Sequence, residues 1–341
     1  MDAQVKLVSK VLVLDSSAEC YDRLKVFCDL NGLVGLKVQD GHVMSVLGSN
    51  VDLGGIFLSE GYSGMTHGGI ELAREIHRIR PELPIFLRRE AGGEWDALDE
   101  RDRKLFNAAY LIDDVDDLRP VIDTCIFSRV YPNVLVRGIS ELTRTALESQ
   151  FKEMRIDVET PYLVRDRIIF GEIFTLIPLE SSWCRGYMML QVEEESLLHL
   201  VKADRTHISG ESSNDFRNLN NVLGEITNLI WGAFKNRYIA YAHSNAHMSQ
   251  VPIVINHLHR YISFGSEDAQ LCFKYTLTDE SVKDGNGNGN GNGNDGKDGN
   301  KPLSLTIYQR FIFNLNWSPN DFKENQASVE ALFDSGELEL F

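Results

Sequence analysis

Five short runs rich in β-forming residues alternate with helical patterns across residues 1–128, and this alternation restricts the fold more than any other feature. The runs are Val11–Leu14, Leu33–Val38, Gly55–Leu58, Ile85–Leu87 and Tyr110–Ile112. Strands that alternate with helices form a parallel sheet that is covered by helices on both faces. We therefore predict an α/β, doubly wound domain over residues 1–128, with its functional groups in the loops after the strands.

One stretch of this region, GGIELAREIHRIRPELPIFL at residues 68–87, resembles the receiver domain of two-component response regulators. The resemblance implies a flavodoxin-like fold for this part of the chain. A working receiver has acidic residues after its first strand to hold Mg²⁺, and an Asp at the end of its third strand to accept the phosphoryl group. It also has a Thr or Ser after the fourth strand and a Lys after the fifth.

This sequence departs from most of that pattern. Only Asp15 follows the first strand, and Ser59 or Glu60 stands where the acceptor Asp is expected. Arg88 ends the fourth strand, and Asp113 lies near the position of the expected Lys. Serine cannot form an acyl phosphate, and a single carboxylate binds Mg²⁺ weakly. We therefore predict a degenerate receiver, or pseudo-receiver.

The function of a pseudo-receiver does not follow from its fold. A scaffold kept for folding or dimerisation is one interpretation. A second is that Glu60 imitates a permanently phosphorylated acceptor. A third is that the domain binds a small ligand and gates the second domain, although the sequence identifies no such ligand.

Helix-breaking residues indicate a boundary after the first domain. Pro132 and Gly138 fall in a predicted linker at residues 129–138, and a new helical pattern begins at Ser140. We place the second domain at residues 139–320.

Charge and hydropathy exclude several classes of partner. The chain holds 34 Lys and Arg against 50 Asp and Glu, a formal net charge of -16, and it has no basic run. Such a chain repels phosphate backbones and anionic bilayers, so neither nucleic acid nor membrane is an expected partner. No apolar run approaches the roughly 18 residues of a membrane span, so we expect a cytoplasmic protein. The five cysteines are scattered and indicate neither a disulfide framework nor a zinc site.

The most informative segment is a helix predicted from about Asp215 to Asn236. Its core positions share one broad arc and are Phe216, Leu219, Val222, Leu223, Ile226, Leu229, Ile230, Ala233 and Phe234. A narrow stripe on the opposite side consists of Asn218, Asn221, Glu225, Asn228 and Gly232. A solvated helix face normally carries Lys, Glu and Arg, and Asn and Gly are poor helix formers. The stripe therefore indicates a function other than solubility.

The sequence GEITNLIWG at residues 224–232 resembles the signature helix of the CheC/CheX/FliY family of CheY-phosphate phosphatases, which has the form G-E-x-x-N-x-x-x-G. RGYMMLQVEEESLLHLV at residues 185–201 resembles the strand and helix before it, and SQVPIVINHLHR at residues 249–260 the strand after it. The resemblance spans residues 139–318 and implies an α+β domain with long helices on an antiparallel sheet. A single motif is similar to the CheX branch, which implies a homodimer joined through sheet edges.

The resemblance also implies a role for each motif residue. Asn228 would hold a water in line with the phosphorus, and Glu225 would accept a hydrogen bond from the Lys of a phosphorylated CheY-like response regulator. Gly224, Gly232 and Asn221 would support this pair. The phosphatase would have no metal or cofactor of its own, because Mg²⁺ comes with the substrate receiver. A non-catalytic receiver-binding adaptor or dimerisation scaffold is the alternative.

Two further segments could suggest metal binding. His243, His247, His257 and His259 fall close together, but their spacing on a turn and a strand makes convergence accidental. The run that begins at Asp284 starts like a calcium loop, but it lies in Gly/Asn repeats without flanking helices. We predict a disordered hairpin loop at residues 284–300 and no metal site.

The tail at residues 321–341 carries an amphipathic pattern at Val329, Leu332 and Phe333. It resembles the short CheY-binding peptide of the flagellar switch proteins FliM and FliY, although that peptide begins those proteins and this one ends the chain. The resemblance implies a docking peptide that holds a receiver near Glu225 and Asn228. An ordinary C-terminal helix is the alternative.

Overall fold

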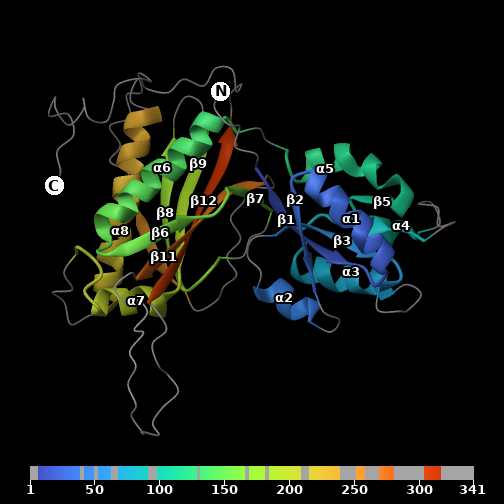
Figure 1. Cartoon of the computed structure of the whole chain (residues 1–341), viewed down its shortest axis with the longest axis horizontal. Coiled ribbons are helices and arrows are strands. Elements are labelled where there is room, and N and C mark those ends of the chain that lie inside the picture. Colours follow the sequence, from blue (N-terminus) through green and yellow to red (C-terminus); the bar gives the residue numbers. More distant parts are fainter. Residues whose placement is uncertain are drawn as a thin grey trace, which may run out of the picture. The chain divides into compact units, whose positions relative to one another are not determined.

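A computed structural model describes most of the chain and divides it into two compact units. The described residues are 7–38, 42–49, 53–62, 68–90, 98–128, 131–165, 169–180, 184–208, 215–238, 251–257, 269–279 and 303–315 (Figure 1). The first unit contains Met1–Tyr131, Thr160–Ile169 and Tyr261–Cys272. The second unit contains Pro132–Glu159, Phe170–Arg260 and Phe273–Phe341. No helix among the described residues is long and apolar enough to cross a membrane.

The first unit is built on a five-stranded sheet in the order β2-β1-β3-β4-β5. Its strands are β1 (Ser9–Leu14), β2 (Leu33–Lys37), β3 (Leu53–Ser59), β4 (Ile85–Arg88) and β5 (Ala108–Tyr110), and the pairs are parallel. Its helices are α1 (Ala18–Leu30), α2 (Val43–Ser49), α3 (Gly68–Ile79), α4 (Glu100–Arg103), the 3-10 helix η3 (Ile112–Leu118) and α5 (Arg119–Cys125). This strand order is the flavodoxin-like one, so the predicted doubly wound fold is confirmed. The predicted fifth strand is wrong at its end, because residue 112 already begins η3.

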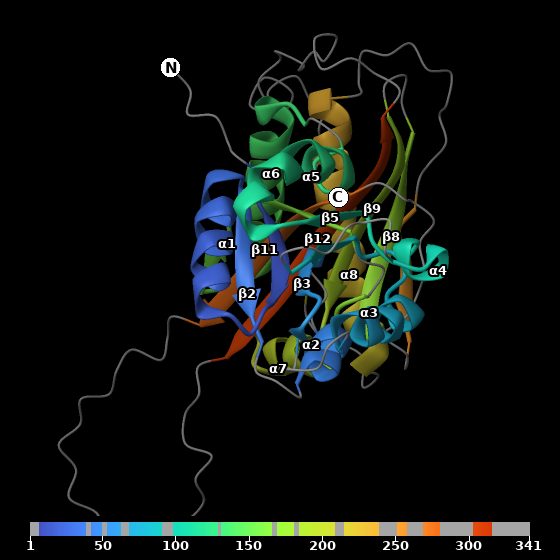
Figure 2. The same ribbon diagram turned by 90° about the vertical axis from the view of Figure 1, so that its right-hand side faces the viewer.

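Alternate residues of the central strands point into two separate cores. Leu12 and Leu14 of β1 pack with α2 and α3, whereas Val11 and Val13 pack with α1 and α5. In Figures 1 and 2, α1 lies on one side of the strands and α3 on the other. Burial on both faces explains why these strands are continuous hydrophobic runs.

A short strand from later in the chain completes the first unit. β7 (Tyr162–Val164) pairs with the residues Gln270–Cys272, and its Leu163 carbonyl accepts a hydrogen bond of 2.8 Å from Ser9 Oγ. The Leu163 N–H donates to the Val8 carbonyl at 2.8 Å. The first unit therefore includes residues far beyond the segment 1–128 in which it was expected.

The second unit is an antiparallel sheet carrying long helices, as predicted. Its sheet runs β10-β8-β9-β12-β11-β6. The strands are β6 (Met154–Val158), β8 (Ile173–Glu180), β9 (Cys184–Val192), β10 (Ile253–Asn256), β11 (Gln270–Asp279) and β12 (Ser304–Leu315). Of β11, residues 273–279 belong to the second unit. The helices are α6 (Asn133–Gln150), α7 (Glu194–Lys202) and α8 (Asp215–Tyr238).

The helices α6 and α8 cover the same face of this sheet. Thr143 of α6 donates a hydrogen bond to Gln309 of β12, and Thr227 of α8 contacts Thr175 of β8. Register places Thr175 and Gln309 opposite the same residue, Leu190 of β9. Residues that face one another across antiparallel strands have their side chains on the same face.

The prediction that Gly138 breaks the chain in a linker is wrong. Helix α6 begins at Asn133, directly after Pro132, and continues through Gly138. A Cβ atom built on Gly138 would lie 1.7 Å from the Tyr238 hydroxyl of α8. Glycine is present here because α6 and α8 approach closely, and not because the chain turns.

The core face predicted for α8 is correct in its middle and wrong at its ends. Leu219, Val222, Leu223, Ile226, Ile230 and Phe234 are buried. Phe216, predicted in the core, is 43% exposed, and Asn218, predicted on the outer stripe, is buried. The buried residues follow rows of i, i+4 spacing, and such rows wind around a helix. A fixed arc therefore also misassigns residues along its edges: Thr227 and Trp231, outside the predicted core, are buried, and Leu229, predicted in the core, is half-buried.

We predict that Gly138→Ala lowers the free energy of unfolding by about 1–3 kcal/mol, because the added methyl overpacks the contact with Tyr238. Adding Tyr238→Phe removes the nearest atom and should restore part of the loss. Urea unfolding of the full chain measures both variants. Gly232→Ala is the matched control, since no atom lies within 4 Å of its built Cβ. It should raise stability by up to about 1 kcal/mol, as expected for a half-buried helix position with room for a methyl group. Equal changes in the free energy of unfolding for Gly138→Ala and Gly232→Ala would contradict this explanation.

Candidate functional site

The helix α8 directs its predicted motif residues away from the core of the second unit. Asn221 and Asn228 are exposed and Glu225 is half-buried. Glu225 and Asn228 are three residues apart and therefore neighbours on one helix face. The structure brings together Asn221, Gly224, Glu225 and Asn228, whereas Gly232 lies one turn further along and Asn218 is buried.

These four residues line an open concavity of about 720 Å³ in the second unit. Its other lining residues come from three distant segments and from α8 itself, and are Gln150, His207, Ile208, Asn220, Val251, Pro252 and Val254. Sequence patterns did not indicate Gln150, His207 or Ile208, because only the folded chain places them beside α8.

Backbone hydrogen bonds hold the part of the lining that contains His207. The His207 N–H donates to the Gln150 carbonyl, and the Lys152 N–H donates to the Arg205 carbonyl, both at 2.9 Å. Between them, Phe151 and Thr206 form an antiparallel bridge. This short ladder fixes the chain after α7 against the end of α6, so this side of the concavity is preformed.

Two side chains of the concavity, Glu225 and Asn228, have no polar partner among the described residues. No hydrogen bond or ion pair joins the Glu225 carboxylate or the Asn228 amide to another residue of the described ranges. Among the described residues of the lining, Glu225 is the only carboxylate, and these residues include no lysine or arginine. The Asn220 Oδ1 atom is buried and also lacks a partner there. The concavity thus presents a carboxylate and several amides whose hydrogen-bonding capacity is unused.

Two glycines of α8 are not explained by packing within the chain. Among the described residues, and apart from the neighbouring backbone of α8, no atom lies within 4 Å of a Cβ built on Gly224 or on Gly232. Each glycine inside a helix costs about 1 kcal/mol relative to alanine. Nothing in the described structure requires this loss.

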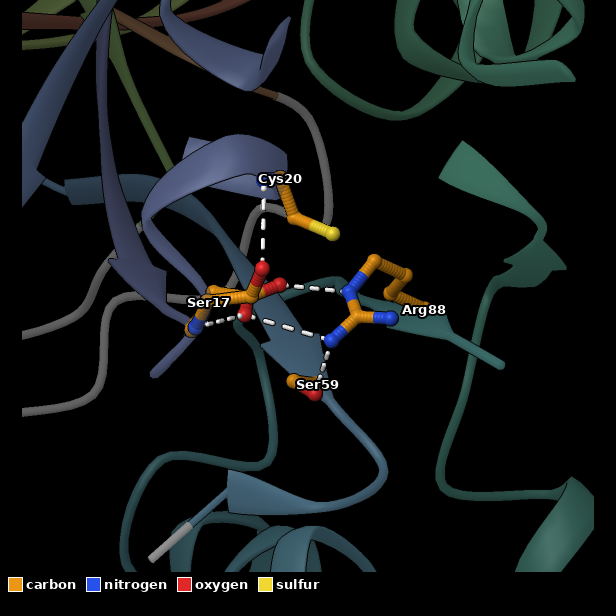
Figure 3. Close-up of polar contacts among 5 residues, drawn as sticks. Ser17, Cys20, Ser59 and Arg88 are labelled. Carbon is orange, nitrogen blue, oxygen red and sulfur yellow. Dashed lines mark hydrogen bonds and ion pairs between the residues drawn. The ribbon is translucent and has the colours of Figure 1, made fainter. Parts of the chain in front are cut away.

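In the degenerate receiver site of the first unit, by contrast, the charged side chains are buried and bonded to one another. Asp15, Ser59 and Arg88 lie at the carboxyl ends of β1, β3 and β4, and all three are buried. Arg88 Nε lies 2.5 Å from Asp15 Oδ2, and Arg88 Nη2 lies 3.2 Å from Asp15 Oδ1. The same Nη2 donates to Ser59 Oγ at 2.7 Å (Figure 3). The guanidinium therefore supplies the positive charge beside Asp15 that Mg²⁺ supplies in a working receiver.

The backbone after β1 completes this cluster. The Ser17 N–H donates to Asp15 Oδ1 at 2.9 Å, and Ser17 Oγ caps α1 by accepting from the Cys20 N–H at 3.4 Å (Figure 3). Burial alone would lower the pKa of the Arg88 guanidinium, but the hydrogen bond and charge of Asp15 outweigh burial and raise the pKa. The guanidinium therefore stays ionised, and both Asp15 oxygens are occupied.

Glu60 and Asp113 do not join this cluster. Glu60 Oε2 lies 2.7 Å from Arg89 Nε in a second buried ion pair. Asp113, in η3, is exposed and pairs with Arg23 of α1. The sequence could have indicated the Asp15–Arg88 pair, because opposite charges end two strands of one parallel sheet, but which arginine takes which carboxylate depends on side-chain direction.

The remaining predicted metal and docking residues are only partly described. His257 follows β10, where its backbone N–H donates to the Glu172 carbonyl at 2.9 Å and its ring lies 5.5 Å from that of Phe174. His243, His247 and His259, the segment 284–300, and Val329, Leu332 and Phe333 lie outside the described residues. Among the residues that the structure describes, no group of three His, Cys, Asp or Glu side chains could hold a metal ion.

We predict that Arg88→Met lowers the free energy of unfolding by about 3–5 kcal/mol, because it leaves the buried Asp15 carboxylate unpaired. Asp15→Asn in the same chain should recover part of this loss. Urea unfolding of the two single variants and the double variant gives the coupling between the residues. Arg23→Met is the control, since it breaks an exposed pair that is worth about 1 kcal/mol at most. A loss for Arg88→Met no larger than for Arg23→Met would show that the cluster is not a tight ion pair.

Among the comparisons with known proteins, only the comparison with solved structures gives matches. No family model and no curated protein sequence matches the chain. A CheX chemotaxis protein from Vibrio vulnificus is 16% identical, and the match covers 52% of this chain and 98% of that one, with a TM-score of 0.34. A CheX–CheY–BeF3–Mg²⁺ complex from Borrelia burgdorferi is 13% identical, covering 52% and 96%, with a TM-score of 0.32. A response regulator from Thermotoga maritima is 15% identical, covering 34% and 99%, with a TM-score of 0.29.

Proposed function

We propose that the second unit is a phosphatase that hydrolyses the aspartyl phosphate of a separate, CheY-like response regulator in two-component or chemotaxis signalling. The observation that carries this proposal is the pair of Glu225 and Asn228, side by side and unpaired in an open concavity. An unpaired carboxylate beside an unpaired amide suits recognition of a partner that brings a cation and a reactive phosphoryl group.

The phosphatase has to supply little more than a correctly placed water molecule. A receiver aspartyl phosphate is an acyl phosphate that already contacts Mg²⁺ and a lysine of its own, so the phosphorus is activated. The missing element is a water placed in line with the bond that breaks. An asparagine amide has both a donor and an acceptor, so Asn228 can orient that water without ionising. Positioning alone can account for a large part of a rate enhancement.

Glu225 has a docking role in this proposal. Its carboxylate would accept a charge-assisted hydrogen bond from the lysine of the partner receiver, which fixes the register of the two proteins. The part of the lining that the structure describes holds no other carboxylate to compete for that lysine. Gly224 and Gly232 would let the partner backbone come close to α8, which explains glycines that nothing in the described structure requires.

Three further implications of the resemblance stay predictions. These are a homodimer joined through sheet edges, a cytoplasmic location, and docking of the receiver by the tail at residues 321–341. In this proposal the first unit serves as a scaffold, because the Ser59 hydroxyl, at the position expected for the phosphoryl acceptor, is bonded to Arg88.

Asn228→Ala should reduce kcat by about 100-fold, as expected for loss of a group that aligns the attacking water. Glu225→Gln should mainly raise KM, by about tenfold, because it weakens a hydrogen bond to a charged group. Release of inorganic phosphate from phosphorylated receivers of the host measures both. Lys235→Ala, at an exposed position of α8 away from the concavity, is the control.

Two outcomes would contradict the proposed phosphatase. Wild-type turnover in Asn228→Ala would remove the role of the amide. Binding of a phosphorylated receiver without any acceleration of phosphate release would identify a non-catalytic adaptor instead.

Gly224→Ala and Gly224→Leu should separate stability from function. Both should raise helix stability, by up to about 1 kcal/mol, because alanine and leucine are better helix formers than glycine. Both should also raise KM for the phosphorylated receiver, and leucine more than alanine, because the added atoms occupy space that the partner needs. Urea unfolding and phosphate release give the two quantities. An unchanged KM in Gly224→Leu would show that the partner does not approach α8 at this position.

A further inference from the structure

One polar contact joins α8 to the sheet directly behind the motif. Thr227 lies between Glu225 and Asn228 in sequence, and its side chain points to the opposite side, where it is fully buried. Its Oγ1 lies 2.7 Å from Oγ1 of Thr175, a fully buried residue of β8. The surrounding α8 contacts, through Leu223, Ile226 and Ile230, are apolar.

Counting hydrogens fixes the direction of this contact. Thr227 Oγ1 also lies 2.7 Å from the Leu223 carbonyl, one turn back on α8. A carbonyl can only accept, so Thr227 donates its single hydroxyl hydrogen to Leu223. Thr175 must then donate its own hydrogen to Thr227. The two hydroxyls form a directed chain from the sheet into the helix.

The position of Thr175 ties this chain to the concavity. Thr175 of β8 is opposite Val254 of β10 in the antiparallel register, so the two side chains share a face of the sheet. Val254 lines the concavity together with Glu225 and Asn228. The hydroxyl chain therefore joins α8 to the strand pair that carries the other side of the concavity.

We infer that the Thr175–Thr227 hydroxyl chain is a positioning device, which fixes the rotation of α8 about its axis and so holds the Asn228 amide where an attacking water must be aligned. This inference rests on the proposed phosphatase function. Apolar contacts are non-directional and tolerate small rotations, whereas a hydrogen bond depends steeply on direction. A 15° rotation moves a polar group about 6 Å from a helix axis by roughly 1.5 Å. A misplacement of about 1 Å can reduce a rate by about 100-fold.

Threonine is a poor choice at this position for stability alone. It is a weak helix former, and a hydroxyl bonded to the carbonyl four residues back slightly destabilises a helix. Valine has nearly the same shape and would fill the same space without a polar group to bury. Two facing threonines are explained if their hydrogen bond is present because it fixes the rotation of α8, and not because it stabilises the fold.

The test compares three variants of the full chain. Thr227→Val leaves the Thr175 hydroxyl buried without a partner, so the urea midpoint should fall. In Thr175→Val/Thr227→Val the interface is wholly apolar, and the midpoint should return to the wild-type value. The kcat of both variants should fall by about 10- to 100-fold with KM changed less than about threefold, because the partner still binds while Asn228 is misplaced. Thr227→Ser keeps the hydroxyl and should retain kcat within about threefold.

Thr143→Val supplies a matched control. Thr143 is a buried threonine of α6 whose Oγ1 donates to Gln309 Oε1 at 3.0 Å on the same face of the sheet. Its removal should lower the urea midpoint and leave kcat unchanged, because this bond lies away from the concavity.

The outcomes separate this inference from the proposed function. Phosphate release by the wild-type chain that depends on Asn228, together with a wild-type kcat in Thr175→Val/Thr227→Val, would overturn the positioning role alone. An equal loss of kcat in Thr143→Val would also overturn it, since any buried hydroxyl would then have the same effect. No release by the wild-type chain, or release that survives Asn228→Ala, would overturn the phosphatase function and this inference with it.

Discussion

Burial of one winding face of α8 against the antiparallel sheet is the interaction on which the second unit depends. The outer side of this helix carries asparagines and glycines, which would make an isolated helix unstable in water. Side chains such as Leu219, Ile226 and Phe234 are fully or almost fully buried, and each contributes about 1.5–3 kcal/mol. This packing lets the outer side consist of residues with poor helix propensity. A functional stripe on α8 is therefore possible only because the opposite side is so completely buried.

The acidic residues at the two candidate sites differ in whether their charge is paired. In the first unit, Asp15 is buried, ion-paired with Arg88 and bonded to the Ser17 N–H, so both of its carboxylate oxygens are bonded within the unit. In the second unit, Glu225 is half-buried in an open concavity and has no described partner. A charge neutralised within the chain stabilises the fold, whereas a charge left unpaired can attract a partner. This contrast explains why we place the activity in the second unit and a scaffold role in the first.

Much of the fold could be predicted from the sequence, because it depends on local patterns. Alternating strand and helix signals indicated the parallel sheet, and the period of α8 identified most of its buried face. The prediction for Gly138 was wrong, because the sequence does not distinguish a glycine that permits a close helix crossing from a glycine that ends a helix. Phe216 and Asn218 were misplaced for a related reason, since the direction in which α8 crosses its neighbours cannot be read from α8 alone.

The sequence by itself determined that Glu225 and Asn228 share one helix face, because three residues make nearly a full turn. Only the tertiary structure decided that Gln150, His207 and Val254 stand around that face, and that Arg88 rather than Arg89 takes Asp15. The physical reason is the range of the interactions. Spacing along a helix is set by neighbouring backbone bonds, whereas a concavity or a buried ion pair requires residues far apart in sequence, whose meeting depends on the packing of the whole unit.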